Sequence, residues 1–297
     1  MKRNLKYILS LLCAFALVFT ASPCFAVTAF AAEKDDNFVF SEYEYITTVR
    51  EMSDDEIDAA ALTVSEVQML RSNAIEDELL ARRELPDADL VSRYGYTYDE
   101  ILILRNYNGG RIEDYPELAA ITGTLTIGKP VILKATTSRI GVKVVWSWDH
   151  CPVVNGNDVF AVYWDPTFGS ESGKMRINTA DSSHTIYYSL NNSDIELAGE
   201  ITQVSPNSAA KSVFSMQDQS GEAWARTGTM KLYFDATSGS AALTELDFIF
   251  AYGHTILSVS PSVSFPASGG ISFGVTTDEA DRRSGYIIVA KNRWYDN

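Results

Sequence analysis

The chain has 297 residues, of which 46% are hydrophobic, 21% charged and 11% aromatic. These proportions are typical of a folded globular protein and exclude a disordered, collagen-like or polytopic membrane protein. The formal net charge of −15 at pH 7 argues against a general nucleic-acid-binding protein, because contact with the phosphate backbone requires a basic surface. We therefore expect no nucleic-acid partner.

The first 31 residues have the pattern of a secretory signal peptide. A basic head precedes an apolar run over residues 7–20, which is shorter than the roughly twenty residues of a transmembrane helix. Ala29-Phe30-Ala31 fits the pattern for cleavage, and a cut after Ala26 is the alternative. We predict that residues 1–31 are removed, that the protein is secreted, and that no transmembrane segment remains. Cys151 is then the only cysteine, so stability must come from a buried core rather than a disulfide.

The rest of the chain divides into two parts of different composition. Residues 33–117 carry 22 acidic and 8 basic residues, whereas residues 118–297 carry 17 acidic and 13 basic residues and all five tryptophans. The change falls close to Asn106-Tyr107-Asn108-Gly109-Gly110, which is a helix-stop and turn signal. We place an acidic helical module at residues 32–117 and a second domain at residues 118–297.

Three capping boxes predict helices in the acidic module. Ser53, Thr63 and Thr97 each precede a glutamate by three residues, a spacing that satisfies free amide donors at a helix N-terminus. Residues 62–71 also align with residues 96–105, which lie 34 positions later, and this predicts a two-unit internal repeat. The acidic surface either keeps the module soluble or marks a docking segment or a removable pro-segment.

The second domain has the alternating, β-rich pattern of short strands separated by turn residues. The predicted strands are residues 121–127, 131–136, 141–148, 158–164, 184–190, 196–204, 224–235, 242–251, 270–275 and 285–290. Because no helical pattern interrupts them, we predict an α+β protein in which the N-terminal acidic helical module is followed by an antiparallel β-sandwich or jelly-roll-like domain.

Asp149-His150-Cys151 places an acid, an imidazole and a thiol in a row. Adjacent side chains of an extended chain point to opposite sides, whereas thiolate catalysis needs Cys and His to face one another. His184 or His254 would have to supply the base through the fold. We expect Cys151 to be a partly buried, unreactive thiol.

Glu245-Leu246-Asp247 is similar to the strand motif of laminarinase-type jelly-roll glycoside hydrolases. In that family a second glutamate follows two or three residues after the aspartate as general acid, and here those positions hold Ile249 and Phe250. The double-displacement mechanism needs that second carboxylate. We therefore predict no catalytic residue on this strand, with its acids facing water and its apolar residues facing the core.

The candidate ligand-binding residues are three tryptophans. Trp146 and Trp148 share one face of a predicted strand, about 7 Å apart, and Trp164 ends the next strand. Exposed, they would form a stacking platform for sugar rings; buried, they would be core, which is the alternative we favour. The histidines lack metal-ligand spacing, and neither a calcium loop nor a Gly-rich phosphate loop occurs. We expect no metal and no cofactor.

Residues 93–107 (RYGYTYDEILILRNY) resemble a helical segment of uncharacterised secreted proteins of Gram-positive bacteria. In those proteins a similar segment precedes a β-rich domain that opens with a Trp-Ser-Trp strand, as at Trp146-Ser147-Trp148. The resemblance implies the same order of domains and brings no activity. We expect a secreted, non-catalytic binding protein whose partner is an envelope glycan or another protein. An extracellular hydrolase acting on glycan or peptide is the alternative.

Overall fold

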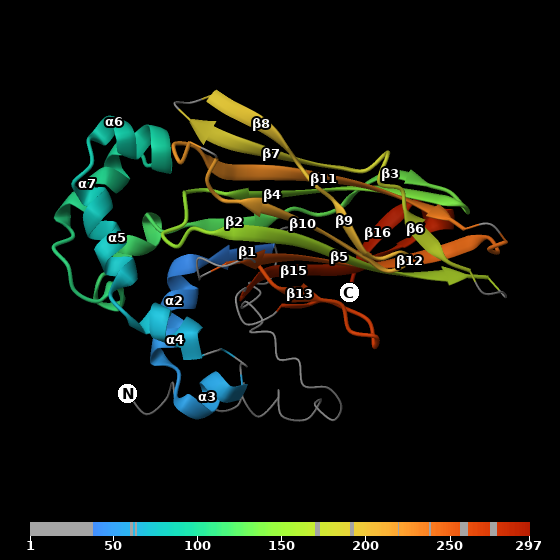
Figure 1. Cartoon of the computed structure of the whole chain (residues 1–297), viewed down its shortest axis with the longest axis horizontal. Coiled ribbons are helices and arrows are strands. Elements are labelled where there is room, and N and C mark those ends of the chain that lie inside the picture. The colour runs from blue at the N-terminus through green and yellow to red at the C-terminus, as the bar shows by residue number, and fades with distance from the viewer. Residues whose placement is uncertain are drawn as a thin grey trace.

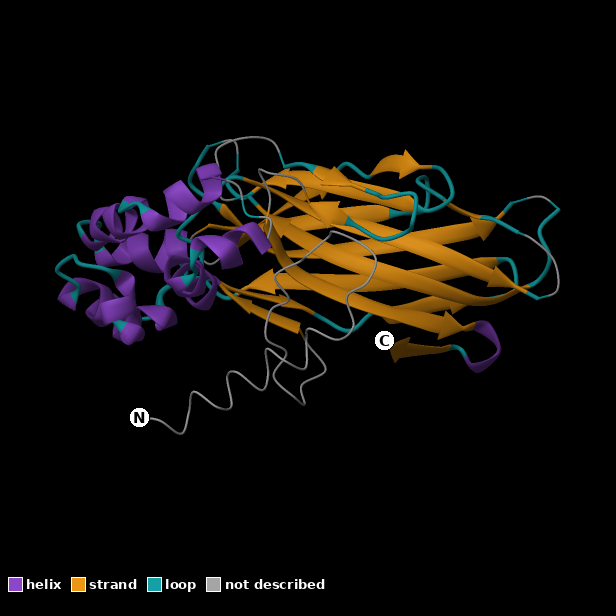
Figure 2. Cartoon of the chain, turned by 90° about the horizontal axis from the view of Figure 1, so that it is seen from below, coloured by secondary structure: helices purple, strands orange, loops and turns teal. Residues whose placement is uncertain are grey.

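The computed structural model describes residues 38–59, 62, 64–169, 173–190, 193–218, 220–237, 239–255, 261–273 and 278–297. The predicted signal peptide therefore lies outside the described residues. Helices gather at one end of a β-sandwich whose strands run along the long axis of the molecule (Figures 1 and 2). Among the helices of the described residues, none is long and apolar enough to cross a membrane.

The helices occupy the part of the chain for which the capping boxes predict them. They are α2 (Glu42–Glu51), α3 (Asp54–Ala59), α4 (Val64–Arg71), α5 (Ala74–Arg83), α6 (Asp87–Asp89) and α7 (Tyr98–Asn106), with a π-helical turn over Leu90–Tyr94. The capping box of Thr97 and Glu100 is confirmed, and that of Ser53 and Glu56 is confirmed by hydrogen bonds in both directions. Thr63 lies outside the described residues.

The first sheet has eight antiparallel strands. Six follow the order β1 (Phe38–Ser41), β2 (Thr124–Ile127), β4 (Arg139–Trp148), β11 (Trp224–Ala236), β7 (Ser183–Leu190) and β8 (Ser193–Gly199). In addition, β3 (Val131–Ala135) pairs with β4, and β6 (Met175–Ile177) pairs with β11. The acidic module thus contributes an edge strand, β1, to this sheet.

The second sheet has six antiparallel strands and packs against the first. Its order is β16 (Arg293–Asp296), β15 (Asp278–Ile288), β12 (Leu243–His254), β5 (Asn157–Phe168), β10 (Ala209–Ser215) and β9 (Thr202–Ser205). A short hairpin of β13 (Val263–Ser264) and β14 (Ser272–Phe273) packs on its outer side, where Ile271 contacts Ala161 and Ala251.

Alternation along each strand divides inward from outward side chains. On β4, Val142, Val144 and Trp146 lie in the core between the sheets, so the residues between them face outward. The same core receives Phe248 and Phe250 from β12, which confirms the predicted inward face of that strand. The antiparallel β-rich character predicted for the second domain is confirmed.

Two buried charged side chains attach the helices to one loop of the sandwich, residues 149–156, which joins β4 to β5. Glu42, the first residue of α2, is buried, and its carboxylate accepts hydrogen bonds at 2.9–3.1 Å from the backbone N–H groups of Gly123, Val153 and Val154. Without this carboxylate the buried amides of Gly123 and Val153 would lose their acceptor, which costs free energy. The carboxylate therefore holds α2 and the loop together.

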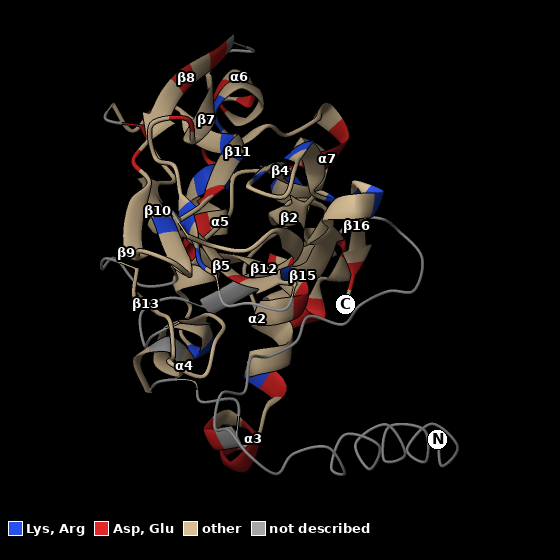
Figure 3. Cartoon of the chain, turned by 90° about the vertical axis from the view of Figure 1, so that its right-hand side faces the viewer, with Lys and Arg blue, Asp and Glu red and all other residues tan. Residues whose placement is uncertain are grey.

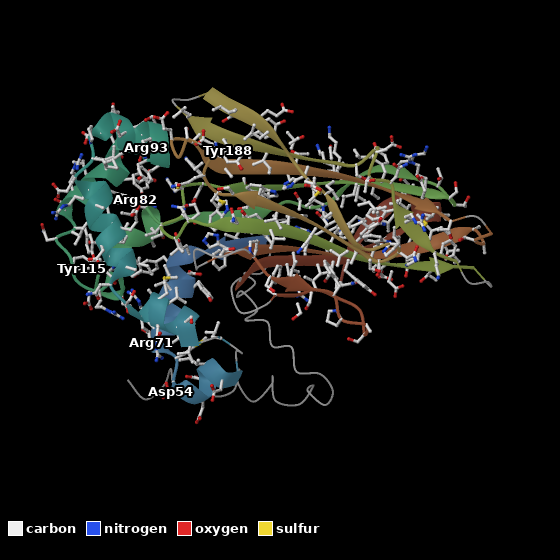
Figure 4. All side chains as sticks on the ribbon, viewed as in Figure 1. Asp54, Arg71, Arg82, Arg93, Tyr115 and Tyr188 are labelled. Atoms are coloured by element: carbon white, nitrogen blue, oxygen red, sulfur yellow. The ribbon has the colours of Figure 1, made fainter. Side chains whose placement is uncertain are left out.

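Arg82 on α5 makes the second attachment. Its buried guanidinium donates to the carbonyl oxygens of Cys151 at 3.0 Å and Pro152 at 2.7 Å, and to the Tyr96 hydroxyl at 2.9 Å. Figure 4 shows Arg82 on the side of the helices that faces the sandwich. The apolar core of the helices also includes Leu118, so it extends past residue 117, where the acidic module was predicted to end.

The remaining differences from the predicted elements have local causes. The predicted strand 196–204 is wrong as a single element, because β8 and β9 are separate strands of different sheets. The predicted strands also omit β1, β6, β10, β13 and β16, which are short or, in β10, carry small and polar residues such as Ala210 and Ser212 on the inward face. Weak alternation of this kind carries little signal.

Candidate functional site

The three candidate tryptophans lie in the core of the sandwich. Trp146 and Trp164 are 0% exposed and Trp148 is 1% exposed. Each indole N–H has a buried partner: Trp146 donates to His184 Nε2 at 3.0 Å, Trp148 to the Tyr252 hydroxyl at 3.1 Å, and Trp164 to the carbonyl oxygen of Met175 at 3.1 Å. In contrast to the stacking platform considered from the sequence, no ring face is open to a sugar, because these positions of β4 and β5 face the opposite sheet.

Cys151 is buried in the loop that Glu42 and Arg82 hold. Burial raises the pKa of its thiol to about 11, so the thiolate is scarce at neutral pH. The hydrogen-bond partner of Sγ among the described residues is Asn155 Oδ1, at 3.6 Å, rather than an imidazole. This arrangement does not activate the thiol.

The two histidines that were candidates for the base of Cys151 form hydrogen bonds with other residues of the core. His184 lies between Trp146 and Ser212, and burial lowers its pKa to about 3, so the ring is neutral. His254 Nδ1 lies 3.0 Å from the buried carboxylate of Asp158. The Asp149-His150-Cys151 sequence is therefore not a catalytic triad in this fold.

The fold brings a third carboxylate to Glu245 and Asp247. Asp247 on β12 lies directly opposite Asp165 on β5, and all three acids are on the outer side of the second sheet. Partial burial raises the pKa of Asp247, and the neighbouring charges of Glu245 and Asp165 raise it further. Only the register between β12 and β5 reveals Asp165, which the sequence alone did not indicate.

The outer side of the first sheet carries a second charged feature, two lysines on neighbouring strands. Lys231 on β11 is directly opposite Lys143 on β4. Residues directly opposite one another have Cβ atoms about 5 Å apart, and like charges in such a pair are destabilising. Among the described residues neither lysine has an ion pair or a side-chain hydrogen bond, so nothing in this part of the chain offsets that repulsion.

We call the outward residues around this pair the lysine face. Its members share exposed or half-buried side chains on β4, β11 and β7: Lys143, Val145, Thr229, Lys231, Thr185 and Tyr187. Figure 3 shows basic positions on β11. Two ammonium groups, with the hydroxyls of Thr229 and Thr185 on the same face, are hydrogen-bond donors that suit a carboxylate, phosphate or sulfate.

The sequence alone does not predict the lysine face. Lys143 and Lys231 are far apart in the chain, and each sits between apolar residues of an ordinary alternating strand. Their meeting depends on the antiparallel register of β4 with β11. Within the described ranges, no group of three His, Cys, Asp or Glu side chains is placed to hold a metal ion.

Neither a family model nor a curated protein matches the sequence. Among solved structures, the chain is similar to the collagen-binding subdomain of the Enterococcus faecalis surface protein ACE, with 8% identity, 54% of this chain and 94% of that chain covered, and a TM-score of 0.30. It is also similar to the collagen-binding domain of the Erysipelothrix rhusiopathiae surface protein RspB, with 10% identity, 59% and 67% covered, and a TM-score of 0.24.

A third similar structure is the CBM3a-L domain of a Clostridium thermocellum cellulosome scaffoldin, with 9% identity, 50% of this chain and 94% of that chain covered, and a TM-score of 0.25. TM-scores of 0.24–0.30 correspond to partial overlap of the chains.

Proposed function

We propose that this chain is a non-catalytic binding protein of the extracellular space or cell envelope, and that its lysine face binds an anionic group of a glycan or protein ligand. The observation that carries the proposal is the direct opposition of Lys143 and Lys231 without a carboxylate partner among the described residues. An arrangement that lowers stability when empty is relieved when an anion lies between the two ammonium groups.

The chemistry of the face favours an extended ligand with repeated anionic groups. Val145, opposite Thr229 and two residues from Lys143, is 37% exposed, so apolar surface adjoins the lysine pair and a small anion would contact only a few polar groups. A polymer with repeated anionic groups binds with higher affinity because several weak contacts form at once. Because the lysines are solvent-exposed or half-buried, binding weakens as salt shortens the screening length to about 8 Å at physiological ionic strength.

The test titrates the secreted chain, residues 32–297, with poly-L-glutamate and with sulfated dextran, using neutral dextran as the uncharged comparison. We expect saturable binding to the two polyanions and a loss of about tenfold in affinity for Lys143→Gln/Lys231→Gln. Lys211→Gln is the matched control, because Lys211 is a half-buried lysine on β10 of the second sheet. Equal affinity of the double variant, or equal binding of neutral dextran, would overturn the proposal.

The second candidate function is the hydrolase, and one observation favours it. The register places Asp165 directly opposite Asp247, with Cβ atoms about 5 Å apart, so two carboxyl groups lie side by side on one face of the sheet, and glycoside hydrolysis uses a pair of carboxyl groups. The raised pKa of Asp247 also suits a proton donor. Release of reducing ends from a polysaccharide panel, abolished in Asp247→Asn, would favour this function, whereas no release by the intact chain would reject it.

A further inference from the structure

Strand β8 forms the open edge of the first sheet. Its seven residues, Ser193–Gly199, pair with β7 in an unbroken antiparallel register, and the described strands include none on the other side of it. The backbone N–H and C=O groups that do not bond to β7 therefore point away from the sheet. Figure 1 shows β8 at the outer border of the sandwich.

β8 lacks three of the features that protect edge strands. Natural edges are blunted by shortness, by proline or by a β-bulge, and also by charged side chains, most often lysine. The strands at the other ends of the two sheet orders, β1, β9 and β16, have four residues each, and β9 is irregular where it meets β10. β8 is longer, contains neither lysine nor proline, and pairs without a bulge.

The two faces of β8 differ in chemistry. Ile195 and Leu197 stand opposite Tyr188 and Ile186 of β7, yet they are 38% and 41% exposed, whereas Tyr188 and Ile186 are buried. The difference shows that the first sheet extends beyond the cover that the second sheet provides. β8 therefore presents an apolar row on the face that continues the core.

The opposite face of β8 is acidic. Asp194 and Glu196 are exposed and alternate with the two apolar residues, and Figure 3 shows acidic positions along this strand. Among the described residues neither has an ion pair or a side-chain hydrogen bond. The edge thus combines free backbone groups, an apolar row and two unneutralised carboxylates.

We infer that β8 receives an extended segment of another protein, which adds a strand to the first sheet and carries alternating basic and apolar residues. Its apolar side chains cover Ile195 and Leu197, and its Lys or Arg side chains lie opposite Asp194 and Glu196. Strand addition supplies affinity through backbone hydrogen bonds and specificity through alternate side chains. The inference is independent of ligand binding at the lysine face.

The charge pattern disfavours a second copy of this chain as the occupant. Symmetric antiparallel pairing of β8 with β8 of another copy, with the apolar rows on the same side, places Asp194 and Glu196 opposite the same acids of the partner. Like charges directly opposite one another destabilise a strand pair. A basic segment replaces this repulsion by attraction.

The probe is a fluorescently labelled, end-blocked heptapeptide of alternating Lys and Val. Its binding is measured by fluorescence anisotropy as the chain, residues 32–297, is added. Two comparison peptides separate the contributions: one is N-methylated at every residue, which removes the backbone donors, and one alternates Glu and Val. We expect the Lys–Val peptide to bind and both comparison peptides to bind at least about tenfold more weakly. Equal binding of the methylated peptide would overturn strand addition.

A charge reversal tests the site itself. Asp194→Lys/Glu196→Lys should weaken binding of the Lys–Val peptide by about tenfold and strengthen binding of the Glu–Val peptide. Glu51→Lys/Glu117→Lys makes the same change in net charge at exposed helical positions and should leave both affinities unchanged. Circular dichroism establishes that the variants are folded. An unchanged preference after the reversal, or sedimentation showing a dimer that the reversal abolishes, would refute a basic heterologous partner.

Discussion

The centre of the sandwich and the junction with the helices bury different kinds of side chain. Around Trp146 the core consists of aromatic rings and a neutral His184, including Phe214 stacked on the indole with ring centroids 5.0 Å apart. At the junction, Glu42 and Arg82 bring full charges to the backbone of one loop. The centre is therefore stabilised mainly by apolar area and close packing, whereas the junction adds to its apolar contacts a few hydrogen bonds from buried charged groups.

The largest expected effect tests the packing at the centre. Trp146→Ala should lower the free energy of unfolding by about 4 kcal/mol, because it removes a fully buried side chain and leaves a cavity. Gly228 on β11 sits against this indole so closely that an added Cβ would lie 2.3 Å from it. Gly228→Ala alone should therefore also destabilise, by about 2 kcal/mol.

The two substitutions together provide the control, measured by urea unfolding of all four forms. In the Trp146→Ala background the methyl group of Gly228→Ala enters the cavity, so its cost should nearly disappear. Strictly additive losses would mean that the Trp146 indole is not packed against Gly228 of β11.

The next largest effect tests the junction. Glu42→Gln replaces a carboxylate oxygen with an amide group that cannot accept a hydrogen bond, so at least one of the three backbone amides loses its acceptor. We expect a loss of about 2 kcal/mol in the free energy of unfolding. Glu44→Gln is the matched control, because Glu44 lies in the same first turn of α2 but is exposed, and it should change stability by a few tenths of a kcal/mol. Equal losses of stability from the two substitutions would contradict the role of Glu42 in holding α2 to the loop.

The junction also explains which parts of the molecule the sequence can predict. Capping boxes such as Thr97 with Glu100 and strands with inward residues such as Val142 and Val144 are local patterns, and local physics determines them. Glu42 resembles any acid in the first turn of a helix until the fold brings it to Val153. The meetings of Lys143 with Lys231 and of Asp165 with Asp247 depend likewise on strand register, which no local pattern encodes.

A smaller effect separates the two regions by pH. At the junction, His150 Nε2 lies 3.2 Å from Glu100 on α7, and Nδ1 lies 3.2 Å from Asp149. Burial alone lowers the pKa of His150, but Asp149 and Glu100 outweigh it and hold this pKa above the ordinary 6.5. Because folding raises the pKa, this stabilisation is complete below pH 6.5 and is lost as the pH rises through the folded-state value.

His184 at the centre has the opposite dependence. Folding lowers its pKa to about 3, so its contribution to the free energy of unfolding is complete above pH 6.5 and is lost as the pH falls toward 3.

The prediction concerns His150 at the junction. In urea unfolding from pH 4 to 9, His150→Gln should lower the free energy of unfolding by about 1 kcal/mol at pH 5.5 and by less at pH 9. A cost that stays constant over this range would show that the His150 contacts do not depend on its charge.

The smallest expected effect on stability is at the lysine face. Lys143 points outward from β4, the strand whose Trp146 points into the core. Lys143→Gln removes one member of an opposed like-charged pair, so the free energy of unfolding should rise by about 0.5 kcal/mol at low salt and by less at high salt. Lys211→Gln on the second sheet lacks such a partner in the described residues and should leave stability nearly unchanged. Thermal unfolding at two salt concentrations measures both.

The sign of this change matters more than its size. A substitution at the centre or the junction that weakens ligand binding also weakens the fold, so its effect on binding cannot be assigned to contact with the ligand. Lys143→Gln is expected to stabilise the chain while weakening its binding to polyanions, and an effect of opposite sign on the two properties cannot arise from partial unfolding. If stability and binding fall together, the lysine pair is part of the scaffold and the anion-binding function has lost its support.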